Sequence, residues 1–188
     1  MKMKKYKVVL FGPYGVGKTN IISVFCDGKY NEESKTTINA NFLPANIIVD
    51  SENSVLLHIW DTAGQEKYRC LLPMYIRNAD SLVLVFDISS KESFLEAEKW
   101  YYEIQNEKDV NSVTILVGNK HDLVGEVNQT QYLEFCEQNK AIFIMTSAKN
   151  GMNISDLFQL IACELIKRDM GYETSSDVSE SVSFKSCC

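Results

Sequence analysis

The sequence lacks the features that would mark a membrane-spanning, secreted or zinc-binding protein. It has no run of the roughly 20 apolar residues that a transmembrane helix needs. Its N-terminus has no apolar signal segment, so we expect a chain that begins life in the cytosol. No His or Cys cluster has the spacing of zinc ligands. Cys26, Cys70, Cys136 and Cys163 occur singly among apolar residues, which predicts buried, reduced thiols and not a disulfide framework.

Basic residues are outnumbered by acidic ones, 19 to 25. The formal net charge is −6 and the isoelectric point is about 5.0, which argues against nucleic acid as the main partner, because a phosphate backbone needs a basic face. The lysine-rich start "MKMKKYK" is short and leads directly into a predicted strand. A length of 188 residues, 45% of them hydrophobic, is typical of one soluble domain with a sizeable core.

Apolar, β-branched runs alternate with helical patterns along the chain. Expected strands span residues 6–11, 42–49, 54–60, 81–86, 113–117 and 142–145, and expected helices 18–27, 67–77, 91–106, 129–139 and 154–167. Turn residues between the second and third runs predict an antiparallel hairpin, and the other strands should be parallel. We therefore predict an α/β domain over residues 1–168, with a six-stranded, mostly parallel sheet covered by helices on both faces. Residues 169–188, rich in Ser and acids, predict a disordered tail.

The segment "GPYGVGKT", Gly12 to Thr19, matches the P-loop pattern G-x-x-x-x-G-K-[ST] and lies between a predicted strand and helix. Its backbone N–H groups and the helix N-terminus favour phosphate oxygens. Lys18 should reach the terminal phosphates, and the Thr19 hydroxyl should bind Mg²⁺. The context disfavours an ordinary glycine-rich turn, but the pattern does not choose between ATP and GTP.

Two later segments indicate which base the nucleotide carries. In "NKHD", Asn119 to Asp122, the Asp122 carboxylate can accept from the ring N–H and the amine of guanine, whereas adenine presents an acceptor at the ring position. In "TSAK", Thr146 to Lys149, the backbone N–H near Ala148 is placed to meet the guanine carbonyl. Each motif alone fits a surface turn, so their weight comes from their position after strands of one sheet.

The segment "WDTAGQE", Trp60 to Glu66, ends the third predicted strand. Asp61 corresponds to a Walker-B carboxylate that holds Mg²⁺ through water. The backbone N–H of Gly64 can approach a γ-phosphate, and Gln65 can orient the attacking water. This segment therefore predicts hydrolysis in addition to binding.

These motifs, in this order, resemble the Ras-superfamily small GTPases, and the similarity covers about residues 6–167. The Trp before "DTAGQE", the segment "KESFLEAEKW" and the terminal "CC" resemble the Rab branch, and "YRCLLPMYIRNAD" looks most like its endosomal members. The resemblance implies that Thr37 closes over Mg²⁺ and the γ-phosphate and that Tyr30 packs against guanine. It also implies an aromatic triad that binds effectors, Phe42, Trp60 and Tyr75, although a core role for these rings is a rival interpretation.

The resemblance implies three sets of site residues. The catalytic residues would be Gln65, Lys18 and Thr37, and the Mg²⁺ ligands Thr19, Thr37 and Asp61. The nucleotide would contact Gly12, Tyr14, Gly15, Val16, Gly17, Lys18, Thr19, Asn20, Tyr30, Thr37, Gly64, Asn119, Lys120, Asp122, Ser147, Ala148 and Lys149. Bound GTP or GDP and Mg²⁺ are thus the expected ligands.

Some positions depart from the family pattern. Tyr14 stands where a small residue is usual, and Asn39 and Asn41 precede Phe42 in place of the usual residues, which predicts unusual effectors. A ring at Tyr14 can displace the attacking water or bar an arginine finger, so an alternative function is a GTP-binding effector scaffold with severely impaired hydrolysis. A P-loop nucleoside or nucleotide kinase is a further alternative, but the sequence shows neither an Arg-rich lid nor an acceptor site.

The last two residues, Cys187 and Cys188, resemble the doubly geranylgeranylated end of Rab proteins. Lys185 is the one basic residue after position 168, so electrostatic attraction to lipid is weak and two lipid chains are needed for a stable anchor. Two unmodified thiols are the alternative. The implied partners are an exchange factor, an activating protein, effectors, a GDP-dissociation inhibitor and a prenylation escort protein. We expect a monomer on the cytoplasmic face of endosomal or other vesicular membranes, cycling with the cytosol.

Overall fold

The computed structural model describes residues 3–33, 37, 40–51 and 53–171. Asn39, most of the predicted tail and the two terminal cysteines lie outside the described residues. Their predicted roles therefore stay predictions.

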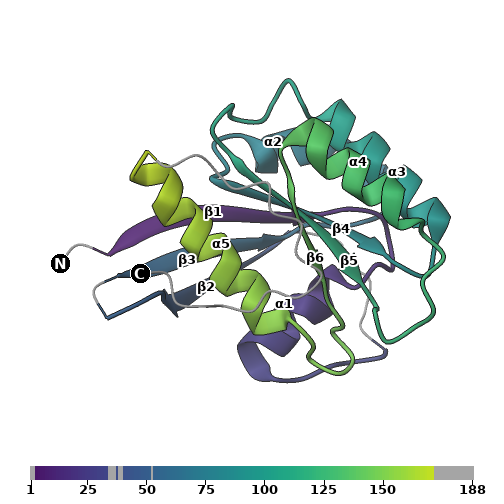
Figure 1. Ribbon diagram of the computed structural model, residues 1–188, viewed down its shortest axis with the longest axis horizontal. Helices are drawn as coiled ribbons and strands as arrows, with labels where there is room; N and C mark the ends of the chain where they lie inside the picture. The colour runs from purple at the N-terminus through teal and green to yellow at the C-terminus, as the bar shows by residue number, and fades with distance from the viewer. Residues whose placement is uncertain (1–2, 34–36, 38–39, 52, 172–188) are drawn as a thin grey trace.

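The fold is built on a twisted sheet with strand order β2-β3-β1-β4-β5-β6 (Figure 1). Its strands are β1 (Lys4–Phe11), β2 (Asn41–Ile48), β3 (Ser54–Asp61), β4 (Ser81–Asp87), β5 (Val113–Asn119) and β6 (Ile142–Met145). β2 pairs antiparallel with β3, and the other neighbours pair in parallel. The predicted six-stranded sheet with one antiparallel strand is confirmed, and the carboxyl ends of its parallel strands share one edge.

The helices are α1 (Lys18–Asp27), η1 (Glu66–Leu71), α2 (Leu72–Ile76), α3 (Lys91–Glu103), α4 (Gln129–Asn139) and α5 (Ile154–Asp169). The single helix predicted over residues 67–77 is instead a 3-10 helix followed by a short α-helix, because Pro73 lacks an N–H and suits the first turn of a new helix. α3 ends at Glu103 and not at residue 106, and α5 continues to Asp169. No helix among the described residues is long and apolar enough to cross a membrane.

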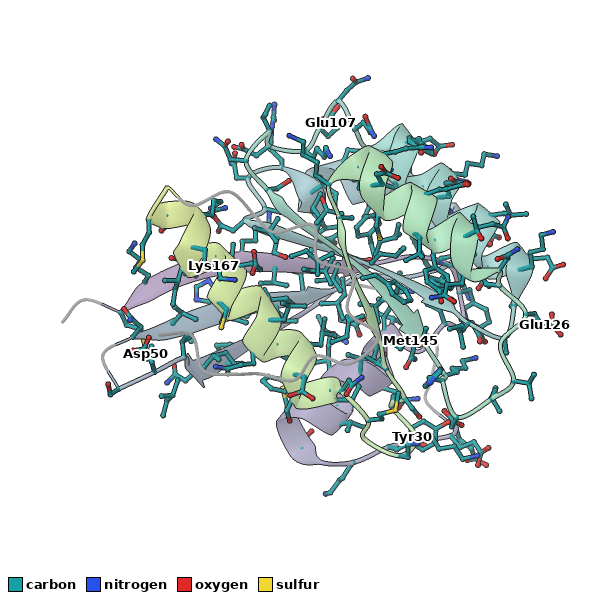
Figure 2. All side chains as sticks on the ribbon, viewed as in Figure 1. Tyr30, Asp50, Glu107, Glu126, Met145 and Lys167 are labelled. Carbon is teal, nitrogen blue, oxygen red and sulfur yellow. The ribbon has the colours of Figure 1, made fainter. Side chains whose placement is uncertain are left out.

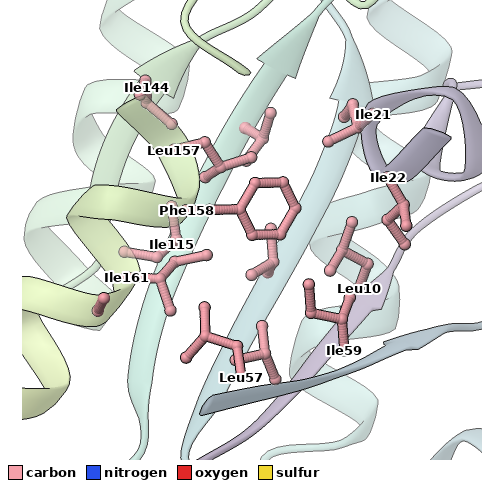
Figure 3. Packing of buried hydrophobic residues seen from close by; sticks show 14 of the residues in the cluster. Leu10, Ile21, Ile22, Leu57, Ile59, Ile115, Ile144, Leu157, Phe158 and Ile161 are labelled. Atoms are coloured by element: carbon pink, nitrogen blue, oxygen red, sulfur yellow. The ribbon is translucent and has the colours of Figure 1, made fainter. Parts of the chain in front are cut away.

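Both faces of the sheet are covered, as the continuous apolar runs predicted. Alternate residues of β1 point to opposite faces, with Val8 and Leu10 packed below α1 and α5, and Val9 and Phe11 below α2, α3 and α4. On the first face, Phe158 of α5 lies among aliphatic side chains of the sheet and α1 (Figure 3). This double cover leaves the carboxyl edge of the sheet as the place where a ligand can enter.

The cysteines only partly match the expectation. Four described cysteines are free, and Cys136 and Cys163 are buried as predicted. Cys26 and Cys70, however, are exposed, so the prediction of buried thiols is wrong for them. Cys26 lies in the last turn of α1, and Cys70 lies on the 3-10 helix, which has no buried residue.

Candidate functional site

A cavity of about 410 Å³ opens at the carboxyl edge of the sheet. Tyr30 on the loop after α1 and Met145 at the end of β6 lie at this end of the molecule (Figure 2). The lining residues come from the loop after β1, from α1 and the loop behind it, and from the loops after β3, β5 and β6: Tyr14, Gly15, Gly17, Lys18, Thr19, Asn20, Tyr30, Glu32, Thr37, Thr62, Gly64, Asn119, Lys120, Asp122, Leu123, Ala148 and Lys149. The structure thus brings together most of the residues predicted to hold the nucleotide.

Some predicted residues do not line the cavity. Gly12, Val16 and Ser147 support lining residues from behind, and Asp61 lies behind Thr19. Glu32, Thr62 and Leu123 line the cavity without having been predicted. Thr62 and Leu123 directly follow predicted residues in the sequence, and this adjacency was the signal that could have revealed them.

The phosphate loop holds a buried lysine against its own backbone. Lys18 Nζ donates to the carbonyl oxygens of Gly12 and Pro13, both at 2.7 Å. Burial lowers the pKa of Lys18 to about 8, although the nearby Asp61 opposes this shift. Gly12 has φ 138°, and a Cβ there would lie 2.2 Å from the carbonyl oxygen of Val85, so only glycine fits.

The start of α1 is open to an anion. Gly17 precedes the helix with φ 97°, and its helix has neither a side-chain cap nor an acidic residue in the first turn. The first N–H groups of a helix have no partner within it, and the helix dipole favours negative charge there. Together with the Lys18 ammonium, this end of the cavity is suited to phosphate oxygens.

Three oxygen-bearing side chains meet beside the phosphate loop. Thr19 Oγ1 donates to Asp61 Oδ2 at 2.7 Å and lies 2.9 Å from Thr37 Oγ1. Asp61 Oδ1 is buried without a hydrogen-bond partner among the described residues, and burial raises the pKa of this carboxyl group although Thr19 and Lys18 lower it. Among the described residues, no group of three or more His, Cys, Asp or Glu side chains is arranged for a metal. An oxygen set with one unsatisfied carboxylate atom fits Mg²⁺.

Asn119 connects the phosphate loop to the two base motifs. Its side chain is 1% exposed, and its Nδ2 donates to the carbonyl oxygen of Val16 at 2.8 Å. Its Oδ1 accepts from the Thr146 hydroxyl at 3.1 Å and from the Ala148 N–H at 3.2 Å. The Ala148 N–H that was predicted to meet a guanine carbonyl therefore also supports Asn119.

Asp122 lies exposed at the cavity wall, and its Oδ1 accepts a 2.5 Å hydrogen bond from the Ser147 hydroxyl. Ser147 thereby fixes the direction of this carboxylate. Lys120 is anchored differently, because its Nζ lies 2.7 Å from Asp87 Oδ2. Burial raises the pKa of Asp87, but the hydrogen bonds from Lys120 and Ser89 outweigh burial and lower it.

Of the two predicted residues that follow β3, Gly64 lines the cavity and Gln65 does not. A Cβ on Gly64 would lie 2.4 Å from Lys18 Nζ and 2.6 Å from the carbonyl oxygen of Pro13, so its backbone approaches the phosphate loop closely. Gln65 precedes the 3-10 helix in an extended conformation and does not line the cavity. The structure therefore brings the predicted γ-phosphate contact into the site but does not bring the predicted water-orienting side chain.

Phe42, Trp60 and Tyr75 form a contiguous row of rings. Their centroids lie 5.3 Å apart between Phe42 and Trp60 and 5.8 Å apart between Trp60 and Tyr75. Phe42 is 47% exposed, whereas Trp60 and Tyr75 are partly buried and pack against the core. The row is thus a surface feature with a core contribution from two of its members.

Comparison with known proteins agrees with this geometry. A model of the Ras family matches residues 7–167. The chain belongs to this family. It is 40% identical over 164 residues to the Ras-related protein Rab-5B of Plasmodium falciparum (isolate 3D7), which covers 87% of this chain and 79% of that protein. It is 35% identical over 196 aligned positions to the Ras-related protein Rab5A of Oryza sativa subsp. japonica, covering 100% of this chain and 96% of the relative.

These matches place the chain in the Rab branch of the Ras superfamily. The resemblance inferred from the motifs is therefore confirmed. The chain is a small GTPase that binds GTP and GDP, and the motifs predicted to hold the phosphates and the base converge at the cavity on the sheet edge.

Proposed function

We propose that this Rab-like GTPase is a GTP/GDP-switched regulator of vesicular membrane traffic that binds its nucleotide with Mg²⁺ and hydrolyses GTP slowly. The observation that carries the proposal is the Asn119 side chain, which joins the phosphate loop at Val16 to the base motif at Ala148 across one cavity. This connection sets the distance between phosphates and base. In this proposal Asp122, held by Ser147, reads guanine.

Mg²⁺ would be held by Thr19 and Thr37, with Asp61 behind them, and it would neutralise the charge that develops on the phosphates. Lys18 would exchange its carbonyl partners for phosphate oxygens. Thr37 and Gly64 would contact the γ-phosphate in the GTP state, and its loss on hydrolysis would release both segments. The resulting change of surface is what effectors would recognise, with Phe42, Trp60 and Tyr75 at its centre.

The position of Gln65 supports a slow intrinsic reaction. Its side chain is not among those that line the cavity, so in this proposal it turns toward the γ-phosphate before it orients a water molecule. An activating protein would stabilise that movement and add positive charge to the transition state. An exchange factor would open the cavity for nucleotide release.

The base assignment is tested with Asp122→Ala. Competition of GDP, ADP and xanthosine diphosphate against a fluorescent GDP analogue would measure preference. We expect the preference for GDP to fall by about 100-fold, because the guanine donors lose a charged acceptor. Glu126→Ala, another exposed acid remote from Tyr30 in Figure 2, serves as the control. Unchanged preference in Asp122→Ala would contradict the assignment.

A second candidate function is a GTP-bound effector scaffold whose hydrolysis is severely impaired by Tyr14. This residue lines the cavity, and it directly follows Pro13, whose carbonyl oxygen lies against Gly64. A ring at this place borders the path of any group that approaches the γ-phosphate from a partner. Single-turnover hydrolysis with Tyr14→Ser distinguishes the two functions.

For location, we propose endosomal or other vesicular membranes, because both relatives carry Rab5 names. Geranylgeranyl groups on Cys187 and Cys188 would anchor the protein, with an escort protein and a GDP-dissociation inhibitor shielding the lipids. A tagged full-length chain should mark membranes, and the Cys187→Ser/Cys188→Ser double variant should be cytosolic. Membrane signal that persists in the double variant would contradict lipid anchoring.

A further inference from the structure

Asn20, the third residue of α1, makes a paired contact with the backbone of Asn31 in the loop behind the helix. Asn20 Nδ2 donates to the carbonyl oxygen of Asn31 at 3.0 Å, and Asn20 Oδ1 accepts from the Asn31 N–H at 3.2 Å. The Asn20 side chain is 8% exposed. One planar amide therefore engages both the donor and the acceptor of a single residue, as a neighbouring β-strand would.

This contact depends on the chemistry of asparagine. Asn and Gln carry an amide, whose donor and acceptor sit on one carbon at the spacing that matches a backbone N–H and carbonyl, and Gln is longer by a methylene. Asn is also a poor helix former, because its side chain competes for backbone hydrogen bonds. Its presence inside α1 is therefore explained by the contact with Asn31 and not by the helix.

The residues on either side of Asn31 line the cavity. Tyr30 precedes it and Glu32 follows it, and both belong to the lining. The Asn31 side chain also accepts from the Glu33 N–H at 3.0 Å, which turns the chain just after the contact. Asn20 thus fixes the point from which Tyr30 and Glu32 approach a bound nucleotide.

A second contact holds the chain between α1 and β2 at Thr37, whose hydroxyl lies 2.9 Å from the hydroxyl of Thr19. In the proposed function that hydroxyl pair turns to Mg²⁺ and the γ-phosphate, so it changes with the nucleotide. The Asn20–Asn31 contact uses only groups of the protein itself and does not require the γ-phosphate. The two contacts should therefore respond differently to hydrolysis.

We propose that Asn20 is a positioning residue that keeps residues 30–32 at the cavity in both nucleotide states and thereby slows nucleotide release. This inference rests on the proposed binding of guanine nucleotide. It assigns to an exchange factor the task of breaking the contact between Asn20 and the Asn31 backbone. Asn20 itself lines the cavity, but its side-chain oxygen and nitrogen are both bonded to Asn31, so in this proposal its side chain controls nucleotide affinity through the loop.

The test is the release rate of a fluorescent GDP analogue, chased with excess GDP at saturating Mg²⁺. We expect Asn20→Ala to release it about tenfold faster, the factor that corresponds to the net loss of one to two hydrogen bonds. Asn31→Ala is the matched control, because it keeps the backbone N–H and carbonyl that Asn20 contacts. Its release rate should stay within about twofold of the wild type, because the one bond it removes, from the Glu33 N–H to the Asn31 side chain, is exposed to solvent and lies beyond the contact.

Two further measurements separate positioning from general destabilisation. Amide exchange at position 31 should accelerate in Asn20→Ala but not in Asn31→Ala. In a Tyr30→Ala background, Asn20→Ala should accelerate release less than in the wild type, since the two residues act in series. Equal acceleration in both backgrounds would contradict positioning through Tyr30.

Asn20→Asp guards against a variant that fails to fold, because it is nearly isosteric and keeps the acceptor while losing the donor. It should also release GDP faster than the wild type. If wild-type protein binds GDP and both Asn20 variants release it at the wild-type rate, the positioning role is overturned while the proposed function stands. Wild-type protein that binds no guanine nucleotide would overturn the proposed function itself.

Discussion

Thr19 and Asp61 are joined by a 2.7 Å hydrogen bond although they lie 42 positions apart in the chain. Thr19 belongs to the first turn of α1, and Asp61 ends β3. The contact therefore fixes the phosphate loop relative to the segment that carries Gly64. It also uses only one carboxylate oxygen, and the other is buried without a partner among the described residues.

This arrangement predicts that Asp61→Asn weakens Mg²⁺ binding while leaving the phosphate loop intact. The amide can still accept from Thr19, but it lacks the charge that favours a divalent cation. The measurement is the rate of GDP release as a function of Mg²⁺ concentration. We expect the Mg²⁺ concentration that gives half of the maximal slowing of release to rise about tenfold or more. Asp87→Asn is the control, because Asp87 holds Lys120 on the base side and should shift release at every Mg²⁺ concentration alike. An unchanged Mg²⁺ midpoint in Asp61→Asn would refute the metal assignment.

Gly64→Ala should impair hydrolysis more than GDP binding. Its Cβ would lie 2.6 Å from the Pro13 carbonyl oxygen, so the segment must retreat from the phosphate loop and carry Gln65 with it. We expect this displacement to lower the single-turnover rate of GTP hydrolysis by about tenfold or more, because catalysis is sensitive to a misplacement of about 1 Å. Gly125→Ala is the matched control, since the nearest atom to its new Cβ is Ile88 Cγ1 at 3.6 Å. Wild-type hydrolysis in Gly64→Ala would show that the close approach is unimportant.

The end of α5 should make stability depend on pH. Asp169 Oδ2 accepts from Lys4 Nζ at 3.0 Å and from the Tyr6 hydroxyl at 2.9 Å. Burial raises the pKa of Asp169, but these hydrogen bonds and those from Arg168 outweigh it and lower the pKa. The folded protein therefore binds fewer protons than the unfolded chain as the pH falls through the acid range, so this stabilisation is present above about pH 4 and lost below the lowered pKa.

Asp169→Asn should accordingly lower the free energy of unfolding by about 1 kcal/mol at pH 7, a value reduced for the partial exposure of the group. At pH 3 the difference from the wild type should shrink. Denaturant unfolding at both pH values, with GDP and Mg²⁺ saturating, measures it. Glu107→Gln is the control, because it removes another negatively charged, exposed side chain. Its effect on the free energy of unfolding should be the same at the two pH values. A difference for Asp169→Asn that is independent of pH would exclude the carboxylate as its source.

The sheet and most of the cavity could be predicted from the sequence because they follow from repeating physical constraints. Apolar runs such as the one at β4 must be covered on both faces, and parallel strands bring their following loops to one edge. The motifs after β1, β3, β5 and β6 therefore had to meet. This is why Asp122 and Lys18 line the same cavity although the chain separates them widely.

Other features depend on single contacts that periodicity does not encode. The division of the helix predicted over residues 67–77 depends on how Pro73 starts a new turn, and the exposure of Cys70 follows from that division. The partners of Asn20 depend on the path of the loop behind α1, which has no repeating pattern. The position of Gln65 outside the cavity depends likewise on loop conformation, so a motif that names its role does not fix its place.

Tyr14→Ser tests how the unusual residue of the phosphate loop acts. Tyr14 is 62% exposed at the rim of the cavity, so its ring leaves the interior open while bordering the entrance. We expect the intrinsic single-turnover rate to change by less than about twofold, because the attacking water would bind deeper in the cavity than this exposed ring. Hydrolysis stimulated by an activating protein should rise by about tenfold or more, because an arginine from the partner must pass this rim. A large rise in the intrinsic rate would place the obstruction at the water itself and favour the scaffold function, whereas equal rates in both assays would remove Tyr14 from the mechanism.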